Sequence, residues 1–240
     1  MRKRRKRKGG IVKAVFCLLP DFMLFCVMIF IFSHVFGYIS AHFFEGGLKH
    51  NNTAYSEEYT IAENMEVLQR IDPKIWAVCT NEEKLEFVQT VANAEANYLG
   101  IPKPLPVRVY DLPDNRLGQF AHEEYEIQID EDYLYFCDVN QDGYKESTVL
   151  DIVKTICHEA YHVYQREVVS AYLSVDDNHQ NLLLFLPASE YLENLKNYNY
   201  PKDDYYAYYN QRLEKDARAY ADDAIMDYIK VQLDKDKTTS

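Results

Sequence analysis

Cysteine is scarce in this 240-residue chain, and its number is odd. Of the five cysteines, Cys17 and Cys26 fall in an apolar N-terminal segment, and Cys79, Cys137 and Cys157 lie beyond it. Five thiols cannot all pair within one chain, so the sequence excludes a small scaffold built on disulfides, although one bridge could form. Cys157 is predicted to be a buried, small apolar residue.

Basic residues are also scarce over most of the chain. The first 41 residues hold eight of the 26 Lys and Arg and one of the 38 Asp and Glu. The other 199 residues therefore carry 18 basic and 37 acidic side chains, a net charge of −19. Such a surface repels the phosphates of nucleic acids, so no nucleic-acid partner is expected. No internal repeat is evident, and a region of this size is expected to form one domain.

The N-terminus combines a basic block with a long uncharged run. Seven of the first eight residues are Lys or Arg, and the 18 residues from Phe22 to Ile39 carry no formal charge, which is just long enough to cross a bilayer. Basic flanks stay in the cytoplasm. We therefore expect a single-pass protein of the cell membrane with these parts: a basic cytoplasmic tail (1–13), a transmembrane signal anchor (14–40), a linker (41–56) and an extracytoplasmic domain (57–240). Cleavage of the apolar segment as a signal peptide, near Ala41, is the alternative.

Neither glycine nor proline interrupts residues 146–172, which predicts a long helix. The hydroxyl residues at 147–148 can cap its start. Its apolar residues recur at steps of three and four and form one stripe: Val149, Ile152, Val153, Ile156, Ala160 and Val163. His158 and His162 lie one turn apart on roughly the opposite face, so both imidazoles can reach one metal ion.

The motif HEAYH adds Glu159 beside these two histidines. A carboxylate there can accept a proton from a water on the metal as that water attacks a carbonyl. With this motif the chain resembles the zincin superfamily of zinc metallopeptidases. The resemblance implies that His158 and His162 bind Zn²⁺, that Glu159 is the general base, and that the substrate is a peptide or a protein.

A third ligand is expected from a second helix, residues 212–229. Glu214, Ala217 and Ala221 share one face of it, and the small residues would let this helix approach the first one closely. The pattern E-x-D-A resembles the glutamate-bearing helix of gluzincin-type peptidases, which implies that Glu214 is the third zinc ligand. Those families often carry an acidic residue four positions later, where this chain has Arg218.

Three other residues remain alternative third ligands. Glu190 follows the HExxH motif at a spacing common among gluzincins, Asp216 lies on another face of the Glu214 helix, and His179 is in a loop without ligand spacing around it. Six tyrosines also gather between positions 198 and 209. One of them could donate a hydrogen bond to an oxyanion, but packing of the connecting segment accounts for each of them.

The other patterns predict a small sheet and supporting helices. Residues 123–130 and 105–111 alternate as strands. The resemblance implies that an edge strand lies beside the active-site helix, where it would bind extended peptide, and we assign residues 123–130 to this position. Helices are expected over 57–71 and 80–100. Residues 138–143 begin like a calcium loop but lack its final glutamate, so a polar turn is favoured.

Together these patterns predict an α+β fold, with a zincin-like domain behind one transmembrane helix. The domain would contain a small mixed or antiparallel sheet, the HExxH helix and the Glu214 helix. The predicted activity is zinc-dependent hydrolysis of peptide bonds at the outer face of the membrane. Two alternatives stay open: a zinc-containing module that binds a peptide without cleaving it, and an acidic surface protein in which HExxH occurs by chance.

Overall fold

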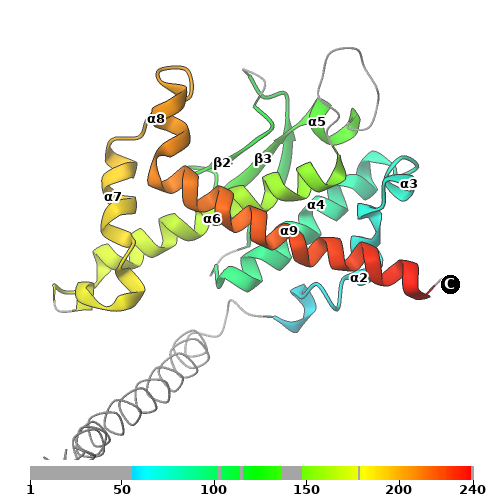
Figure 1. Ribbon diagram of the computed structural model, residues 1–240, viewed down its shortest axis with the longest axis horizontal. Helices are drawn as coiled ribbons and strands as arrows, with labels where there is room; N and C mark the ends of the chain where they lie inside the picture. Colours follow the sequence, from blue (N-terminus) through cyan, green and yellow to red (C-terminus); the bar gives the residue numbers. More distant parts are fainter. Residues whose placement is uncertain (1–55, 102–103, 114–115, 137–147, 178, 239–240) are drawn as a thin grey trace, which may run out of the picture. The chain divides into compact units, whose positions relative to one another are not determined.

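Helix α6, Val149–Ser174, is the central element of the structure (Figure 1). The computed structural model describes residues 56–101, 104–113, 116–136, 148–177 and 179–238, all within one compact unit, Thr53–Ser240. Thr148 begins α6 with a capping box, in which its hydroxyl accepts the Asp151 N–H and the Asp151 carboxylate accepts the Thr148 N–H. The predicted apolar stripe is confirmed, because each of its members is at most 1% exposed.

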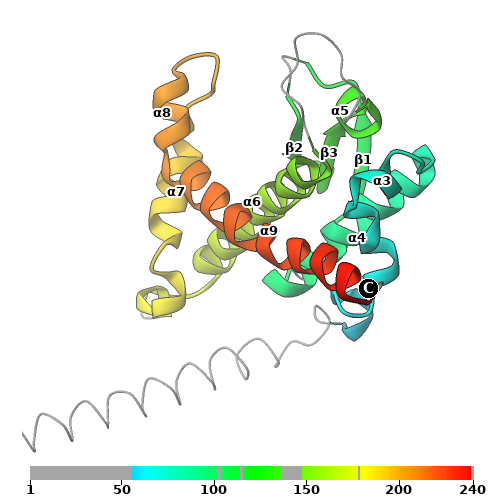
Figure 2. The same ribbon diagram turned by 45° about the vertical axis from the view of Figure 1, so that its right-hand side comes forward.

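Two other long helices pack on α6. Helix α9, Arg212–Thr238, crosses it, and helix α4, Asn81–Leu99, also contacts it (Figures 1 and 2). The predicted small-residue face of α9 is confirmed, since Ala217 and Ala221 are fully buried. The helix expected over 80–100 is confirmed as α4, and Gly100, with φ of 68°, ends it in the left-handed conformation that glycine favours.

A three-stranded sheet lies beside α6 (Figure 2). Its strands are β1, Val107–Tyr110, β2, Gly118–Ala121, and β3, Glu126–Asp130, in the order β1-β3-β2. Strand β3 pairs with β1 in parallel and with β2 in antiparallel orientation. The strand predicted over 123–130 is therefore central, and its assignment as the edge strand beside the HExxH helix is wrong. Strand β2 takes that place, because the chain folds back at residues 122–125 and pairs β2 with the second side of β3.

The single helix expected over 57–71 is wrong. That stretch forms short elements, followed by one further helix: η3 (Glu57–Tyr59), α2 (Met65–Leu68), η4 (Gln69–Ile71) and α3 (Pro73–Trp76). Polar side chains compete for the backbone here. The Asn64 amide donates to the carbonyls of Glu58 and Thr60, and the Thr60 hydroxyl accepts the Glu63 N–H.

Short helices complete the described part of the domain: α5 (Glu131–Phe136), η5 (His179–Asn181), η6 (Leu183–Phe185), α7 (Ala188–Lys196) and α8 (Tyr205–Asn210). Helix α7 contacts both α6 and α9, and α8 leads directly into α9. Figure 2 shows α7 and α8 near the N-terminal end of α9, whereas α4 lies near its C-terminal half. The N-terminal end of α9 thus lies next to α6, α7 and α8.

The fold is mixed α+β, as the sequence predicted at that level. The predicted tail and signal anchor, all but one residue of the linker, and the loop over 138–143 lie outside the described residues. Among the helices that are described, none combines the length and the apolar content that a membrane span requires.

Candidate metal centre

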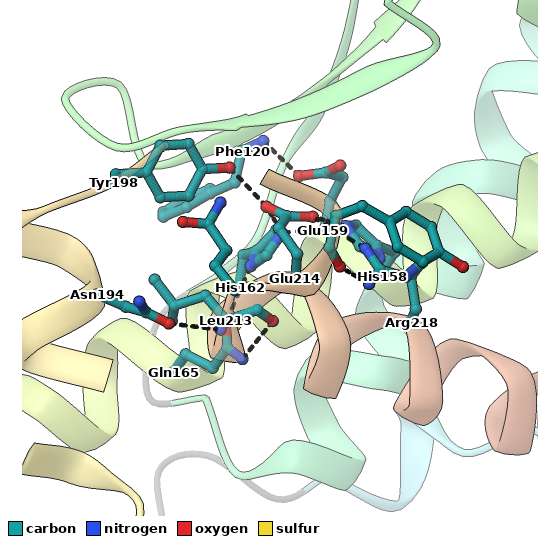
Figure 3. Close-up of polar contacts among 12 residues, drawn as sticks. Phe120, His158, Glu159, His162, Gln165, Asn194, Tyr198, Leu213, Glu214 and Arg218 are labelled. Atoms are coloured by element: carbon teal, nitrogen blue, oxygen red, sulfur yellow. Dashed lines mark hydrogen bonds and ion pairs between the residues drawn. The ribbon is translucent and has the colours of Figure 1, made fainter. Parts of the chain in front are cut away.

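His158 and His162 face each other on one side of α6 (Figure 3). Their Nε2 atoms are 3.0 Å apart and their ring planes are nearly perpendicular. Each side chain keeps 17% of its surface exposed, so the pair is accessible from the surface of the domain. The one-turn spacing therefore brings the two imidazoles together as the sequence predicted.

Glu214 reaches the same point from the first turn of α9. Its Oε2 lies 3.3 Å from Nε2 of His158, and its Oε1 lies 3.3 Å from Nε2 of His162. The residue is 1% exposed. Among the described residues, Oε2 of Glu214 is buried and has no hydrogen-bonding partner of acceptable geometry. A buried carboxylate oxygen of this kind is costly unless a cation or a donor accompanies it.

The three side chains fit a metal ion. Zinc binds imidazole nitrogen and carboxylate oxygen at about 2.0–2.2 Å, and a tetrahedral arrangement places such ligand atoms about 3.3 Å apart. The two Nε2 atoms are 3.0 Å apart, and each lies 3.3 Å from a different oxygen of Glu214. One ligand atom from each of the three side chains lies within 4.8 Å of the other two. His158, His162 and Glu214 thus form a cluster that could hold a metal ion.

Protons and charges within the cluster are coupled. Burial raises the pKa of Glu214, but the two imidazoles and the Tyr198 hydroxyl outweigh it and hold this pKa far below its usual range. Burial lowers the pKa of His162, but the Glu214 hydrogen bond and the charges of Glu159 and Glu214 outweigh it and raise this pKa to about 8. In the metal-free protein a proton on His162 therefore balances the Glu214 carboxylate.

Glu159 lies between α6 and the edge strand β2. It is 8% exposed, and its Oε2 accepts a hydrogen bond of 2.8 Å from the Phe120 N–H (Figure 3). Strand β2 passes very close to the helix at Gly118, where a Cβ atom would lie 2.7 Å from Cγ2 of Thr155. Glycine at this position thus allows the strand to hold the Glu159 carboxylate beside the histidine pair.

The alternative third ligands are engaged elsewhere. Glu190 is exposed and lies 3.7 Å from the Arg212 guanidinium. Asp216 accepts hydrogen bonds from Arg212 and from the Tyr191 hydroxyl. His179, at the start of η5, is exposed and pairs with Asp176. The structure therefore brings Glu214, and none of these three residues, to the histidines.

Arg218 also faces the cluster, one turn after Glu214 on α9. Its guanidinium is stacked 3.7 Å above the Tyr209 ring and donates to the Tyr209 carbonyl. One of its nitrogens lies 3.9 Å from Oε2 of Glu214. Arg218 thus places a positive charge beside the Glu214 carboxylate.

Sequence reasoning did not single out three residues around the cluster. Tyr198 donates a hydrogen bond of 2.5 Å to Oε1 of Glu214. Gln165 contacts Nδ1 of His162, and Asn194 holds the backbone just before Glu214. Tyr198 was one of six clustered tyrosines with no feature to distinguish it. Gln165 did carry a signal, because it stands three positions after His162 on the same helix.

No protein-family model, curated protein or solved structure matches this chain. Its function is therefore inferred from the residues of the site.

Proposed function

We propose that this protein is a zinc metallopeptidase of the zincin type, with His158, His162 and Glu214 as zinc ligands. The observation that carries the proposal is the convergence of a buried carboxylate from α9 on two imidazoles from α6, which lie 52 and 56 residues earlier in the chain. Two histidines and one glutamate form one of the common donor sets of catalytic zinc. This set leaves one coordination position open for water or substrate.

Each residue of the site has a defined role in the proposed reaction. Zinc bound there would lower the pKa of a water ligand towards neutrality and polarise the scissile carbonyl. Glu159 would take a proton from the attacking water and deliver it to the departing amine as the peptide bond breaks. Tyr198 and Arg218 hold the Glu214 carboxylate by a hydrogen bond and by charge.

The edge strand β2 supplies a surface for an extended substrate. Because the Phe120 N–H donates to Glu159 and not to β3, the main-chain groups of Phe120 point away from the sheet. Antiparallel pairing alternates, so those of Gly118 point the same way. A peptide paired along this edge would pass beside Glu159, and the Phe120 N–H could exchange its carboxylate partner for the substrate.

The observations favour this proposal over its rivals. A chance HExxH would not account for a buried third carboxylate that faces both histidines and has one oxygen without a hydrogen bond. A module that only binds peptide has no need of a carboxylate at position 159, fixed beside the cluster by a backbone N–H. Anchoring at the outer face of the membrane, through the predicted segment 14–40, is part of the same proposal and restricts substrates to those that reach that surface.

Replacement of Glu159 by Gln tests the proposal on the full-length chain. We expect E159Q to keep its zinc and to lose cleavage of a peptide library by about 10²–10⁴-fold, the usual contribution of a general base. Glu167, on the same helix, accepts a hydrogen bond from the Tyr125 hydroxyl away from the cluster, so E167Q is the matched control and should keep both properties. Zinc-loaded wild type without any peptidase activity would favour the binding module instead.

A further inference from the structure

Gln165 joins the two helices that carry the metal ligands. It lies on α6 with no exposed surface, three residues after His162. Its Oε1 is 2.9 Å from Nδ1 of His162, and its Nε2 donates to the carbonyl of Leu213 at 2.9 Å (Figure 3). Leu213 immediately precedes Glu214, so one buried amide contacts both the side chain of one ligand and the backbone carbonyl just before another.

The chemistry of these contacts fixes the orientation of the amide. A backbone carbonyl can only accept hydrogen bonds, so the end of Gln165 that meets Leu213 must be its NH₂ group. The other end, which meets His162, is then the carbonyl oxygen, which also can only accept. Nδ1 of His162 must therefore carry a hydrogen. A neutral His162 then has its lone pair on Nε2, the atom that faces His158 and Glu214.

Both backbone polar groups of Leu213 are hydrogen-bonded to side chains. Its N–H donates to Oδ1 of Asn194 on α7 at 3.1 Å, while its carbonyl accepts from Gln165 on α6. The backbone that leads into Glu214 is thus fixed by two side-chain amides from two different helices. An uncharged amide here takes the place that a carboxylate often holds behind a zinc-bound histidine.

We infer that Gln165 is a positioning residue of the metal centre. It selects the His162 tautomer that presents Nε2 to the ion and ties this imidazole to the helix turn that carries Glu214. The inference rests on the proposed function, because it assumes that the cluster binds zinc. Gln165 itself does not reach the reacting atoms, and it acts through His162 and Leu213.

A second glutamine offers a matched control. Gln89 on α4 also uses both ends of its amide, here on backbone groups around β1: its Oε1 accepts the Val107 N–H at 2.9 Å, and its Nε2 donates to the Leu105 carbonyl at 3.0 Å. Like Gln165, it fastens a helix to a neighbouring segment with both ends of the amide. Unlike Gln165, it does not contact any of the three proposed zinc ligands. Q89M and Q165M therefore each remove an amide that joins a helix to a neighbouring segment, but only Q165M is expected to weaken zinc binding.

The experiment measures the zinc dissociation constant of the full-length chain by chelator competition, with the visible spectrum of the Co²⁺-substituted protein as a second readout. We expect Q165M to bind zinc about 10–100-fold more weakly than wild type and to change the cobalt spectrum, because loss of a hydrogen bond behind a ligating histidine has effects of this size. Q89M should stay within about twofold of wild type and leave the spectrum unchanged. A folded Q165M that matches Q89M in affinity and spectrum would overturn the inference.

The tautomer of His162 can be read without any substitution at Gln165. In zinc-loaded wild type, ¹⁵N spectra of the histidine rings, assigned with H162Q, should show a proton on Nδ1 and the metal on Nε2. The opposite tautomer would overturn the inference even if Q165M failed to fold. Wild type that takes up no zinc would instead contradict the proposed function, on which the inference depends.

Discussion

Zinc affinity should fall steeply as the pH drops from 8 to 6. Zinc requires a neutral imidazole, whereas Glu214 and Glu159 raise the pKa of His162 to about 8 in the metal-free protein. Below this pH a proton competes with the ion for Nε2. The apparent dissociation constant is then inversely proportional to the fraction of His162 that is neutral. It should rise by about 5-fold from pH 8 to pH 7 and by about 50-fold from pH 8 to pH 6.

Two measurements on the full-length chain check this prediction. Chelator competition at pH 8, 7 and 6 gives the dissociation constants, once the protonation of the chelator is allowed for. Calorimetry in two buffers with different ionisation enthalpies gives the number of protons released, which should be about 0.9 from His162 at pH 7.

The variant Glu214→Gln tests whether the Glu214 charge causes the pH dependence of zinc binding. Without the Glu214 charge, only Glu159 and Gln165 oppose the effect of burial, so the pKa of His162 should fall. This variant should therefore bind zinc weakly but with a flatter dependence between pH 8 and pH 7. A wild type whose zinc affinity is the same at pH 8 and pH 7 would refute the account of His162 and Glu214 as a proton-balanced pair.

Three further predictions concern stability and packing. Relative to H162Q, the metal-free wild type should lose about 2 kcal/mol in its free energy of unfolding between pH 6 and pH 9. The raised pKa of His162 stabilises the folded protein fully below pH 6.5, and this contribution disappears as the pH rises through 8. A difference in urea midpoint between wild type and H162Q that is the same at pH 6 and pH 9 would contradict this prediction. Gly118→Val should cost about 1–3 kcal/mol and slow cleavage, because even its Cβ would lie 2.7 Å from Cγ2 of Thr155; unchanged activity would show that β2 does not hold the base. Ala217→Leu should cost a similar amount, about 1–3 kcal/mol, and weaken zinc binding by moving α9 away from α6; a variant with native zinc affinity would show that the close approach of these helices is not needed.

Local patterns were enough to predict the histidine pair and its helix. The apolar stripe of α6 and the one-turn spacing of His158 and His162 are properties of a single helix, so the sequence contains them completely. The choice of Glu214 rested on the resemblance of the E-x-D-A pattern to the glutamate-bearing helix of gluzincins. The small residues Ala217 and Ala221 on the same face supported it, because they indicate a close helix–helix contact.

Features that depend on distant partners were not predicted. Strand β3 has the alternation of a half-buried strand, but only its pairing on both sides makes it central and moves the edge position to β2. The stretch 57–71 is a different case, because its helical apolar pattern is interrupted by local hydrogen bonds: the Thr60 hydroxyl accepts the Glu63 N–H, and the Asn64 amide donates to the Thr60 carbonyl. Gln165 becomes important only because folding brings the Leu213 carbonyl, 48 residues away, to its amide.

The metal content of the purified full-length chain tests the central claim most directly. Wild type, H158A and E214A would be compared by elemental analysis after equilibration with zinc and removal of the excess. The account predicts about one zinc per wild-type chain and little or none in either variant, since a site that loses one of three protein ligands binds zinc weakly. Zinc retained in E214A, or no zinc in wild type, would contradict it.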